Sequence, residues 1–233
     1  MKIALLGYGK MGKSIEVIAL QRSHSITLKV SDATSDYNFA DTDVAIDFSV
    51  PTVAVTNIKK ALDAGIPVIS GTTGWLDQYN EIIDYCKSKN GTFLYSSNFS
   101  LGVNIFFELN KRLSELISGF SEYETEIEEI HHTQKLDAPS GTAITLAEEI
   151  IKNTNYTNWT LNQPKPKEIH IEAKRIENVP GTHEISYNSE IDSISIKHTA
   201  HSRQGFAMGA VIAAEWIKDK KGVFSMKDVL NIG

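Results

Sequence analysis

The sequence predicts an α/β protein with an N-terminal, doubly wound parallel sheet and a smaller α+β domain whose sheet is mostly antiparallel. Three features support this. Short apolar strands alternate with helical segments over the first hundred residues, a glycine-rich turn follows the first strand, and strands of alternating polarity dominate the later part of the chain. We expect residues 1–102, completed by 209–233, to form the first domain and residues 103–208 to form the second.

The first strand and the turn after it predict a dinucleotide site. Residues 2–6 read as a short strand that is apolar after Lys2, and residues 13–20 have helical periodicity. Between them stand Gly7, Tyr8, Gly9, Lys10, Met11 and Gly12. This order of strand, GxGxxG and helix is the Rossmann-type fingerprint. Gly7 permits the tight turn, Gly9 leaves space for a pyrophosphate, and Gly12 lets the helix lie close to the strand. Glycine-rich turns are common, so the flanking strand and helix are what make this pattern specific.

An acidic residue follows the second strand, residues 26–30. Asp32 stands twenty residues after Gly12, where a carboxylate can accept hydrogen bonds from the adenosine ribose hydroxyls. The alternative is an ordinary turn residue at a strand end. Ala33 comes next, so no arginine is adjacent to receive a 2′-phosphate, although Lys29 and Lys10 could help there. The sequence therefore favours NADH over NADPH and leaves the use of both open.

The remaining strands of the first domain end in polar loops. We expect strands at 44–49, 66–69 and 92–95, separated by helices at 51–64 and 78–89. In a doubly wound sheet, ligands bind beyond the carboxyl ends of the strands. The small residues of the loop 70–74 could approach the nicotinamide ribose. Such loops are polar in any fold of this kind, so each has a structural interpretation as well.

Residues 103–116 form an amphipathic helix that leads into the second domain. Its expected strands are 125–130, 167–177, 184–187 and 191–198, its helix is 142–153, and residues 153–167 are expected to form a loop. One face of this sheet is left for an oligomer interface or for solvent. A helix at 206–217 and the segment 226–230 are expected to pack on the first domain.

The segment 126–143 is the most informative stretch for chemistry. It contains His131, His132, Lys135 and a Pro-Ser-Gly-Thr turn that opens the helix. Proton donors, a cation and free helical N–H groups suit a site that holds and protonates a carboxylated substrate. The alternative is a surface loop with solvated histidines. A metal site of His131, His132 and Glu129 is disfavoured, because adjacent strand residues point to opposite sides and no third ligand is evident.

Composition restricts the possible partners. The chain has 233 residues and a net charge of −6, which argues against nucleic-acid binding. The single cysteine, Cys86, cannot form an intrachain disulfide and is expected to pack in a helix. No apolar run reaches the ~20 residues of a membrane span, and the N-terminus lacks a signal-peptide pattern. We expect a cytoplasmic protein without a membrane partner.

The motifs together resemble the 4-hydroxy-tetrahydrodipicolinate reductases, also called dihydrodipicolinate reductases. The resemblance is carried by the signature ExxxxHxxxKxDxPSGTA within residues 126–143 and, in order along the chain, by GYGKMG at 7–12, DFSxP at 47–51, GTTG at 71–74, NFSxGVN at 98–104 and HxAxSRxxFAxGA at 198–210. The chain departs from the family in having Ala33 beside Asp32, where an arginine is often found, and a shorter segment between Asp32 and Asp43.

The resemblance implies roles for individual residues. His131 would be the acid/base residue and Lys135 its partner proton donor. Substrate carboxylates would be held by His132, Ser140, Gly141, Thr142 and Thr73. The cofactor would be bound by Gly7, Tyr8, Gly9, Lys10, Met11, Gly12, Asp32, Gly71, Thr72, Thr73, Ser96, Ser97, Asn98 and Phe99.

The activity implied is NAD(P)H-dependent reduction of 4-hydroxy-tetrahydrodipicolinate, with loss of water, in diaminopimelate and lysine biosynthesis. The resemblance implies a homotetramer associated through the second-domain sheets. From the residues themselves we expect no metal. Two alternatives are another two-domain NAD(P)-dependent dehydrogenase of the aspartate or homoserine dehydrogenase type, and a non-catalytic nucleotide-sensing protein. Neither has a reason to keep His131, Lys135 and residues 140–142 in this array.

Overall fold

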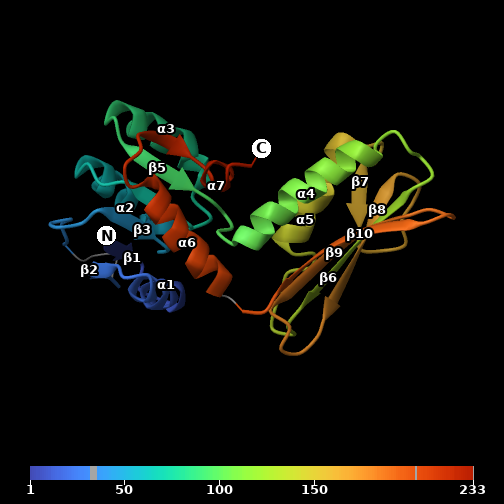
Figure 1. Cartoon of the computed structure of the whole chain (residues 1–233), viewed down its shortest axis with the longest axis horizontal. Coiled ribbons are helices and arrows are strands. Elements are labelled where there is room, and N and C mark those ends of the chain that lie inside the picture. Colours follow the sequence, from blue (N-terminus) through green and yellow to red (C-terminus); the bar gives the residue numbers. More distant parts are fainter. Residues whose placement is uncertain (32–35, 203, 233) are drawn as a thin grey trace. The chain divides into compact units, whose positions relative to one another are not determined.

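The computed structural model describes residues 1–31, 36–202 and 204–232. The chain divides into two compact units, shown in Figure 1. Unit 1 comprises Met1–Asn104 and Gln204–Gly233, and unit 2 comprises Ile105–Arg203.

Unit 1 contains a parallel sheet. In the described residues its strand order is β2-β1-β3-β4-β5-β11, and every pairing is parallel. The strands are β1 (Lys2–Leu6), β2 (Ser25–Val30), β3 (Val44–Asp47), β4 (Val68–Ser70), β5 (Thr92–Tyr95) and β11 (Gly222–Phe224). The helices are α1 (Lys10–Gln21), α2 (Pro51–Asp63), η1 (Leu76–Gln78), α3 (Tyr79–Ser88), α6 (Gln204–Ile217) and α7 (Met226–Leu230). The doubly wound parallel sheet expected from the sequence is confirmed.

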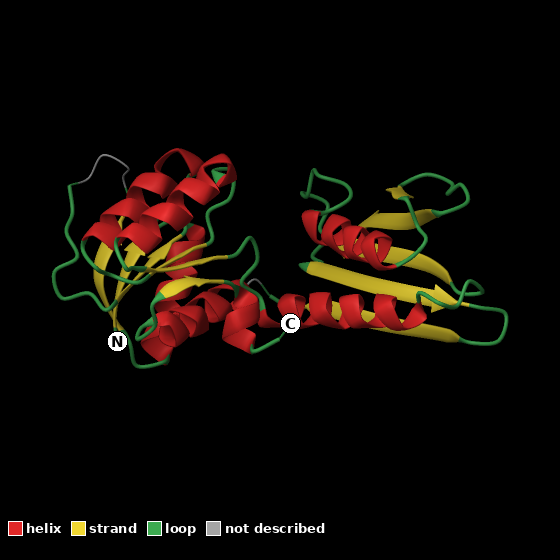
Figure 2. Ribbon diagram, turned by 90° about the horizontal axis from the view of Figure 1, so that it is seen from above, coloured by secondary structure: helices red, strands yellow, loops and turns green. Residues whose placement is uncertain are grey.

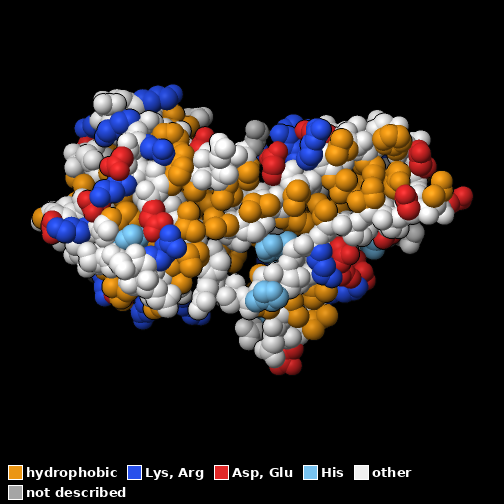
Figure 3. Space-filling model, viewed as in Figure 1, with side chains coloured by type: hydrophobic (Ala, Val, Ile, Leu, Met, Phe, Trp, Pro, Cys, Tyr) orange, Lys and Arg blue, Asp and Glu red, His pale blue; other side chains and the backbone are white. Residues whose placement is uncertain are grey.

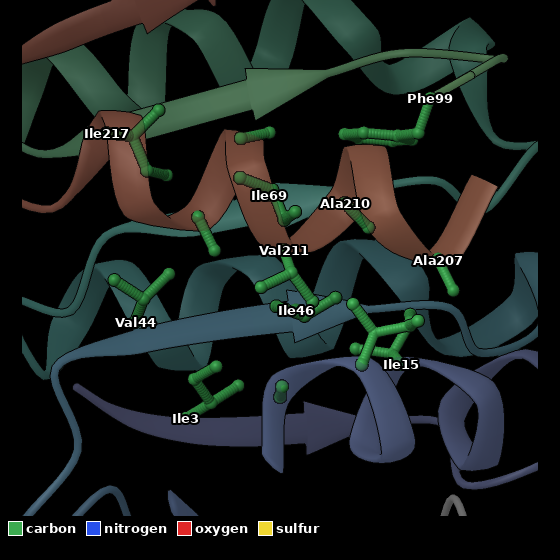
Figure 4. Close-up of a cluster of buried hydrophobic side chains, with 14 of the residues drawn as sticks. Ile3, Ile15, Val44, Ile46, Ile69, Phe99, Ala207, Ala210, Val211 and Ile217 are labelled. Carbon is green, nitrogen blue, oxygen red and sulfur yellow. The ribbon is translucent and has the colours of Figure 1, made fainter. Parts of the chain in front are cut away.

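Helices cover both faces of this sheet, as Figure 2 shows. One core lies between the sheet and α1, α6 and α7, and a second lies between the sheet and α2 and α3. Because both faces are covered, the central strands β1 and β3 are buried along almost their whole length rather than alternating. In the first core the short side chains of Ala207 and Ala210 let α6 lie close to the sheet (Figure 4). The second core includes Cys86, which is 1% exposed.

Unit 2 contains a mixed sheet. Its strands are β6 (Glu124–His131), β7 (Asn158–Thr160), β8 (Glu168–Arg175), β9 (Gly181–Asn188) and β10 (Ser193–Ala200), in the order β10-β9-β6-β8-β7. The β10–β9 and β9–β6 pairings are antiparallel, whereas β6–β8 and β8–β7 are parallel. The antiparallel pairings are the longer ones, so the expected α+β domain with a mostly antiparallel sheet is confirmed. The β6–β8 pairing is parallel because α5 (Gly141–Asn153) crosses over between these strands, and such a connection joins parallel strands.

Helices α4 (Leu101–Ile117) and α5 pack on one face of the unit 2 sheet. Ile127, Ile171 and Ile185 meet Leu146 and Ile150 of α5 in this core. The opposite face presents polar side chains, among them Glu126, Glu128, His170, Glu172, Glu184 and Ser186. The alternation in β6 follows from these two environments.

Some element boundaries differ from the expectations. Helix α1 begins at Lys10 and so includes Gly12, and β3 ends at Asp47 rather than at residue 49. The short strand β7 lies inside the segment expected to be a loop, and β11 was not expected. Within the described residues, no helix is both long enough and apolar enough to cross a membrane.

Candidate active site

The turn between β1 and α1 has the backbone geometry that its glycines suggest. Gly7 has a φ of +100°, and a Cβ there would lie 2.1 Å from the carbonyl oxygen of Phe48. A Cβ on Gly12 would lie 2.2 Å from the carbonyl oxygen of Gly7, so only glycine lets α1 start this close to the strand. A Cβ on Gly9 would meet no described atom within 4 Å, so this glycine leaves open space at the helix N-terminus. That space is what an approaching anion requires.

A pocket of about 240 Å³ opens beside this turn. Gly7, Tyr8 and Gly9 line it from the β1 side, and Phe48 and Ser49 line it from the loop after β3. Because β2 and β3 lie on opposite sides of β1, this edge is the topological switch point of the sheet. Doubly wound sheets bind ligands at such points. Lys10 and Met11 begin α1 beside the same turn, whereas Asp32 and Ala33 lie outside the described residues.

A buried carboxylate organises the adjoining loops. Asp47, at the end of β3, is 0% exposed and accepts hydrogen bonds from four side chains, those of Ser49 (2.7 Å), Asn57 (3.0 Å), Ser70 (2.8 Å) and Thr72 (2.8 Å). Burial raises the pKa of the Asp47 carboxyl, and the four donors oppose that shift. Since the Thr72 hydroxyl is used in this way, it is a structural group in this state, while Thr73 is exposed.

The loop after β5 is held by its own hydrogen bonds. Ser96 Oγ donates to the carbonyl oxygen of Asn98 at 2.7 Å, and Asn104 donates to the same oxygen at 2.9 Å. Ser97 is exposed. Phe99 is 1% exposed, with its ring 5.6 Å from that of Phe48. The side chain of Phe99 thus belongs to the core of unit 1, and its backbone is the part that can face a ligand.

The second strand ends beside an ion pair. Lys29 Nζ lies 2.6 Å from Glu16 Oε1 and 4.9 Å from the centre of the Tyr8 ring. Tyr8 Oη donates to the other carboxylate oxygen of Glu16. The hydrogen bond from Lys29, followed by that from Tyr8, holds the pKa of Glu16 below its usual value. The Lys29 ammonium is therefore already paired with the Glu16 carboxylate of α1.

In unit 2, four ionisable side chains meet at the end of β6. Glu129 is 0% exposed, and its Oε1 lies 3.1 Å from Arg175 Nη2. Its Oε2 lies 3.5 Å from His131 Nδ1 and 3.7 Å from His183 Nε2. The strand register explains the cluster, because Glu129 pairs with His183 on β9 and His131 pairs with Arg175 on β8.

The cluster sets the charge of its members. Burial would raise the pKa of Glu129, but hydrogen bonds from His183, Ser140 and Arg175 lower it to about 2. Burial lowers the pKa of His131 to about 4, and the charges of His183, Lys135 and Arg175 act in the same direction while Glu129 opposes them. At neutral pH the site thus holds a carboxylate and a neutral His131 imidazole.

Ser140 joins this cluster to α5. Its backbone N–H donates to Glu129 Oε2 at 3.0 Å, and its Oγ caps α5 by accepting from the N–H of Ala143 at 3.2 Å. The same Oγ lies 3.0 Å from His183 Nε2. Gly141 and Thr142 follow as the first residues of the helix, where backbone N–H groups have no intrahelical acceptor. Ser140 is thus occupied by structural contacts, and Gly141 and Thr142 offer donors.

The loop between β6 and α5 carries the ammonium group. Lys135 Nζ lies 2.6 Å from Asp137 Oδ2, and Asp137 is largely exposed. Arg175 donates to the backbone oxygens of Lys135 (3.3 Å) and Asp137 (2.5 Å), so the partly buried guanidinium also ties this loop to the cluster. His132 is half-buried at the start of the loop.

Sequence reasoning missed Arg175 and His183. The sequence contained a sign of the role of Arg175, because Arg175 lies on the same strand face as the apolar residues Ile169, Ile171 and Ala173. A charged side chain on an apolar face needs a buried partner of opposite charge. Among the described residues, one group of three possible metal ligands has its donor atoms within 4.8 Å of one another. It consists of Glu129, His131 and His183. The neighbouring cations Arg175 and Lys135 disfavour a metal ion there.

The fold of unit 1 and the ionisable cluster of unit 2 together define a class, the two-domain nicotinamide-dependent oxidoreductases. Comparison with known proteins narrows this class. The family model of the dihydrodipicolinate reductase N-terminus matches residues 1–99, and that of the C-terminus matches residues 102–230. The chain belongs to the dihydrodipicolinate reductase family.

Individual relatives agree with this assignment. The chain is 56% identical to a 4-hydroxy-tetrahydrodipicolinate reductase of Christiangramia forsetii, over 99% of this chain and 98% of that protein. It is 37% identical to one from Methanococcoides burtonii, over 94% and 85% of the two chains.

Solved structures agree on the fold. A dipicolinate-bound dihydrodipicolinate reductase from Paenisporosarcina has a TM-score of 0.77 at 20% identity, with 97% of each chain covered. An aspartate dehydrogenase from Thermotoga maritima has a TM-score of 0.52 at 12% identity, with 94% and 97% covered, and so shares the general fold.

Proposed function

We propose that this protein catalyses the NAD(P)H-dependent reduction of 4-hydroxy-tetrahydrodipicolinate, with loss of water, to tetrahydrodipicolinate in diaminopimelate and lysine biosynthesis. One observation carries the proposal for the site. Residues 131–142 place an imidazole and the start of α5 beside one buried carboxylate, and the loop between them carries an ammonium group. Such a set can hold a dicarboxylate and supply a proton.

Unit 1 supplies the cofactor site in this proposal. The turn from Gly7 to Gly12 receives the pyrophosphate, Asp32 receives the adenosine ribose, and the loops Gly71–Thr73 and Ser96–Phe99 adjoin the nicotinamide. When bound, the reduced nicotinamide supplies the hydride. The protein's own residues bind and orient the cofactor and the substrate, and they transfer the proton.

Unit 2 binds the substrate in this proposal. The N–H groups of Gly141 and Thr142, helped by the α5 dipole, bind a carboxylate. His132 and Lys135 contribute donors and charge. His131 is neutral in the free protein, and the negative charge of a dicarboxylate raises its pKa so that it takes up a proton. His131 then donates this proton while the Lys135 ammonium stabilises charge that develops near the ring nitrogen.

We further propose that NADH is the preferred cofactor. A 2′-phosphate would lie near the end of β2 and would need a cation there. Lys29 is the cation on that strand, and Glu16 already neutralises it at 2.6 Å. Ala33 supplies no charge.

The homotetramer implied by the family resemblance is also a proposal. One edge of the unit 2 sheet is β10, an eight-residue strand whose outer backbone groups could pair with another copy. Figure 3 shows hydrophobic side chains gathered over α4, and Ile105, Leu109 and Leu116 of this helix are about half exposed. Light scattering of the purified protein tests the proposal, since a monomer would contradict it. We place the enzyme in the cytoplasm, where its cofactor and biosynthetic substrate occur.

The activity itself is tested with freshly made substrate. The absorbance of NADH and of NADPH is followed separately, with L-aspartate and L-homoserine as comparison substrates in the oxidative direction. Reduction of the dicarboxylate, with no turnover of the two amino acids, is the expected result. Turnover of either amino acid alone would favour the aspartate or homoserine dehydrogenase alternative.

A further inference from the structure

The proposed reaction uses His131 but leaves unexplained why a carboxylate is buried behind it. Glu129 is fully enclosed, on the side of β6 that faces the core of unit 2. A carboxylate in such a place costs free energy unless hydrogen bonds and charges compensate it. The chain supplies that compensation from three separate elements.

Each oxygen of Glu129 has a different set of neighbours. Oε1 accepts a hydrogen bond from Arg175 Nη2, on β8, at 3.1 Å. Oε2 accepts a hydrogen bond from the backbone N–H of Ser140 at 3.0 Å. The imidazoles of His131 and His183 lie near this same oxygen. Arg175 and Ser140 therefore fix the carboxylate, and the fixed oxygen Oε2 faces His131 Nδ1 at 3.5 Å.

The two nitrogens of His131 are in different surroundings. Nδ1 is buried and makes no hydrogen bond with a described residue in the free protein, and Glu129 Oε2 is the carboxylate oxygen that faces it at 3.5 Å. Nε2 lies at the other edge of the ring beside Gly181, where an added Cβ would be 3.2 Å away. The glycine leaves this edge of the imidazole uncrowded.

We propose that Glu129 is a positioning residue that holds His131 as the Nδ1–H tautomer and leaves Nε2 as the nitrogen that exchanges the catalytic proton. The inference rests on the proposed role of His131 in the reduction. In each turnover the proton on Nε2 passes to the substrate, the imidazole returns to its neutral Nδ1–H form, and solvent restores the Nε2 proton. The Nδ1 proton stays with Nδ1 throughout, because Glu129 remains ionised. A carboxylate behind a catalytic imidazole acts in this way in hydrolase triads.

The charges around His131 support this assignment. His183 on β9, Arg175 on β8 and Lys135 on the following loop all oppose its protonation, and burial acts in the same direction. Glu129 on β6 favours the charged form. Removal of the carboxylate charge should therefore make the imidazolium harder to form, as well as freeing the ring to adopt the other tautomer.

The kinetic test compares Glu129→Gln with Glu128→Gln. Glu128 precedes Glu129 on β6, but its side chain is paired with Lys174 on the opposite face of the sheet. We expect Glu129→Gln to lower kcat by about 10²-fold and to leave the Kd for NADH unchanged. The alkaline limb of the kcat profile, where the His131 imidazolium is lost, should move to lower pH. Glu129→Asp should recover part of kcat, and Glu128→Gln should behave as wild type. A wild-type kcat and pH profile in Glu129→Gln would overturn the proposal.

A spectroscopic test on the wild-type protein requires neither Glu129→Gln nor turnover. The ¹⁵N shifts of the histidine side chains, assigned with His131→Gln, report which nitrogen of His131 carries the proton at pH 7. We expect the Nδ1–H form, and the Nε2–H form would overturn the proposal. This result can be obtained even if Glu129→Gln fails to fold. It also separates the two proposals, since failure to reduce the dicarboxylate rejects the reaction while the tautomer still tests the role of Glu129.

Discussion

Asp47 and Thr72 are joined by a 2.8 Å hydrogen bond that ties the end of β3 to the loop after β4. Asp47→Ala removes the acceptor of this bond and of three others. Since a buried donor left unpaired costs about 1–3 kcal/mol, we expect a loss of about 3 kcal/mol or more in the free energy of unfolding, measured with urea.

The same variant should weaken cofactor binding, because Thr72 lies between the proposed nicotinamide contacts Gly71 and Thr73. NADH titration by fluorescence measures this effect. Asp77→Ala, an exposed change in η1 of the same unit, is the matched control and should leave both quantities unchanged. Wild-type stability in Asp47→Ala would mean that the buried network contributes little.

The Lys29–Glu16 pair should influence the choice of cofactor. Glu16→Gln releases Lys29 from its carboxylate, and the freed ammonium can then interact with a 2′-phosphate. We expect the ratio of kcat/KM for NADPH to that for NADH to rise by about threefold to tenfold, the modest effect typical of an exposed charge. Glu81→Gln, which breaks the exposed Lys59–Glu81 pair, should leave the ratio unchanged. An unchanged ratio in Glu16→Gln would show that Lys29 does not govern the preference.

His131→Gln and Lys135→Ala test the proposed proton donors. Each should lower kcat by about 10²-fold or more, the usual contribution of general acid–base catalysis, while the Kd for NADH stays close to wild type because both residues belong to unit 2. Lys152→Ala, at the other end of α5 and exposed, is a control for the loss of a lysine. Near-normal turnover in either active-site variant would remove the role assigned to it.

The β1–turn–α1 region was predictable because its constraint is local. Gly7 and Gly12 are required by backbone contacts within a few residues or with the adjacent strand, and the sequence shows them directly. The sequence analysis did not specify which pairings of the mostly antiparallel unit 2 sheet are parallel, although the helix between β6 and β8 indicates a parallel pair. The short strand β11 has three residues and depends on its partner β5 rather than on its own periodicity.

The candidate site was predictable only where it is contiguous in sequence. His131, Lys135 and Ser140 come from one segment and could be proposed together. Arg175 and His183 reach Glu129 through strand register, which involves residues more than forty positions apart and is not visible in any local pattern. Sequence reasoning also treated His131 as protonated, whereas burial and the nearby cations lower its pKa to about 4 in the free protein.

That lowered pKa predicts a pH dependence of stability. In the unfolded chain His131 has the ordinary histidine pKa of 6.5, so between pH 6.5 and 4 the unfolded state binds the extra proton and stability falls as the pH falls. We expect wild type to lose about 2 kcal/mol more than His131→Gln between pH 7 and pH 5, measured by urea unfolding. Equal losses in the two proteins would mean that His131 titrates normally when folded.

The proposed protonation of His131 by substrate predicts proton uptake on binding. Dipicolinate is a stable dicarboxylate of the substrate's shape. One carboxylate about 4 Å from the imidazole contributes about 4 kcal/mol at an effective dielectric constant of 20, or about three pKa units. The pKa of His131 would then rise from about 4 to about 7. Calorimetry at pH 6.5 in buffers of different ionisation enthalpy should therefore show uptake of most of one proton by wild type and much less by His131→Gln. If dipicolinate binds wild type with a heat that is independent of the buffer, His131 stays neutral in the complex, and the proton must come from Lys135.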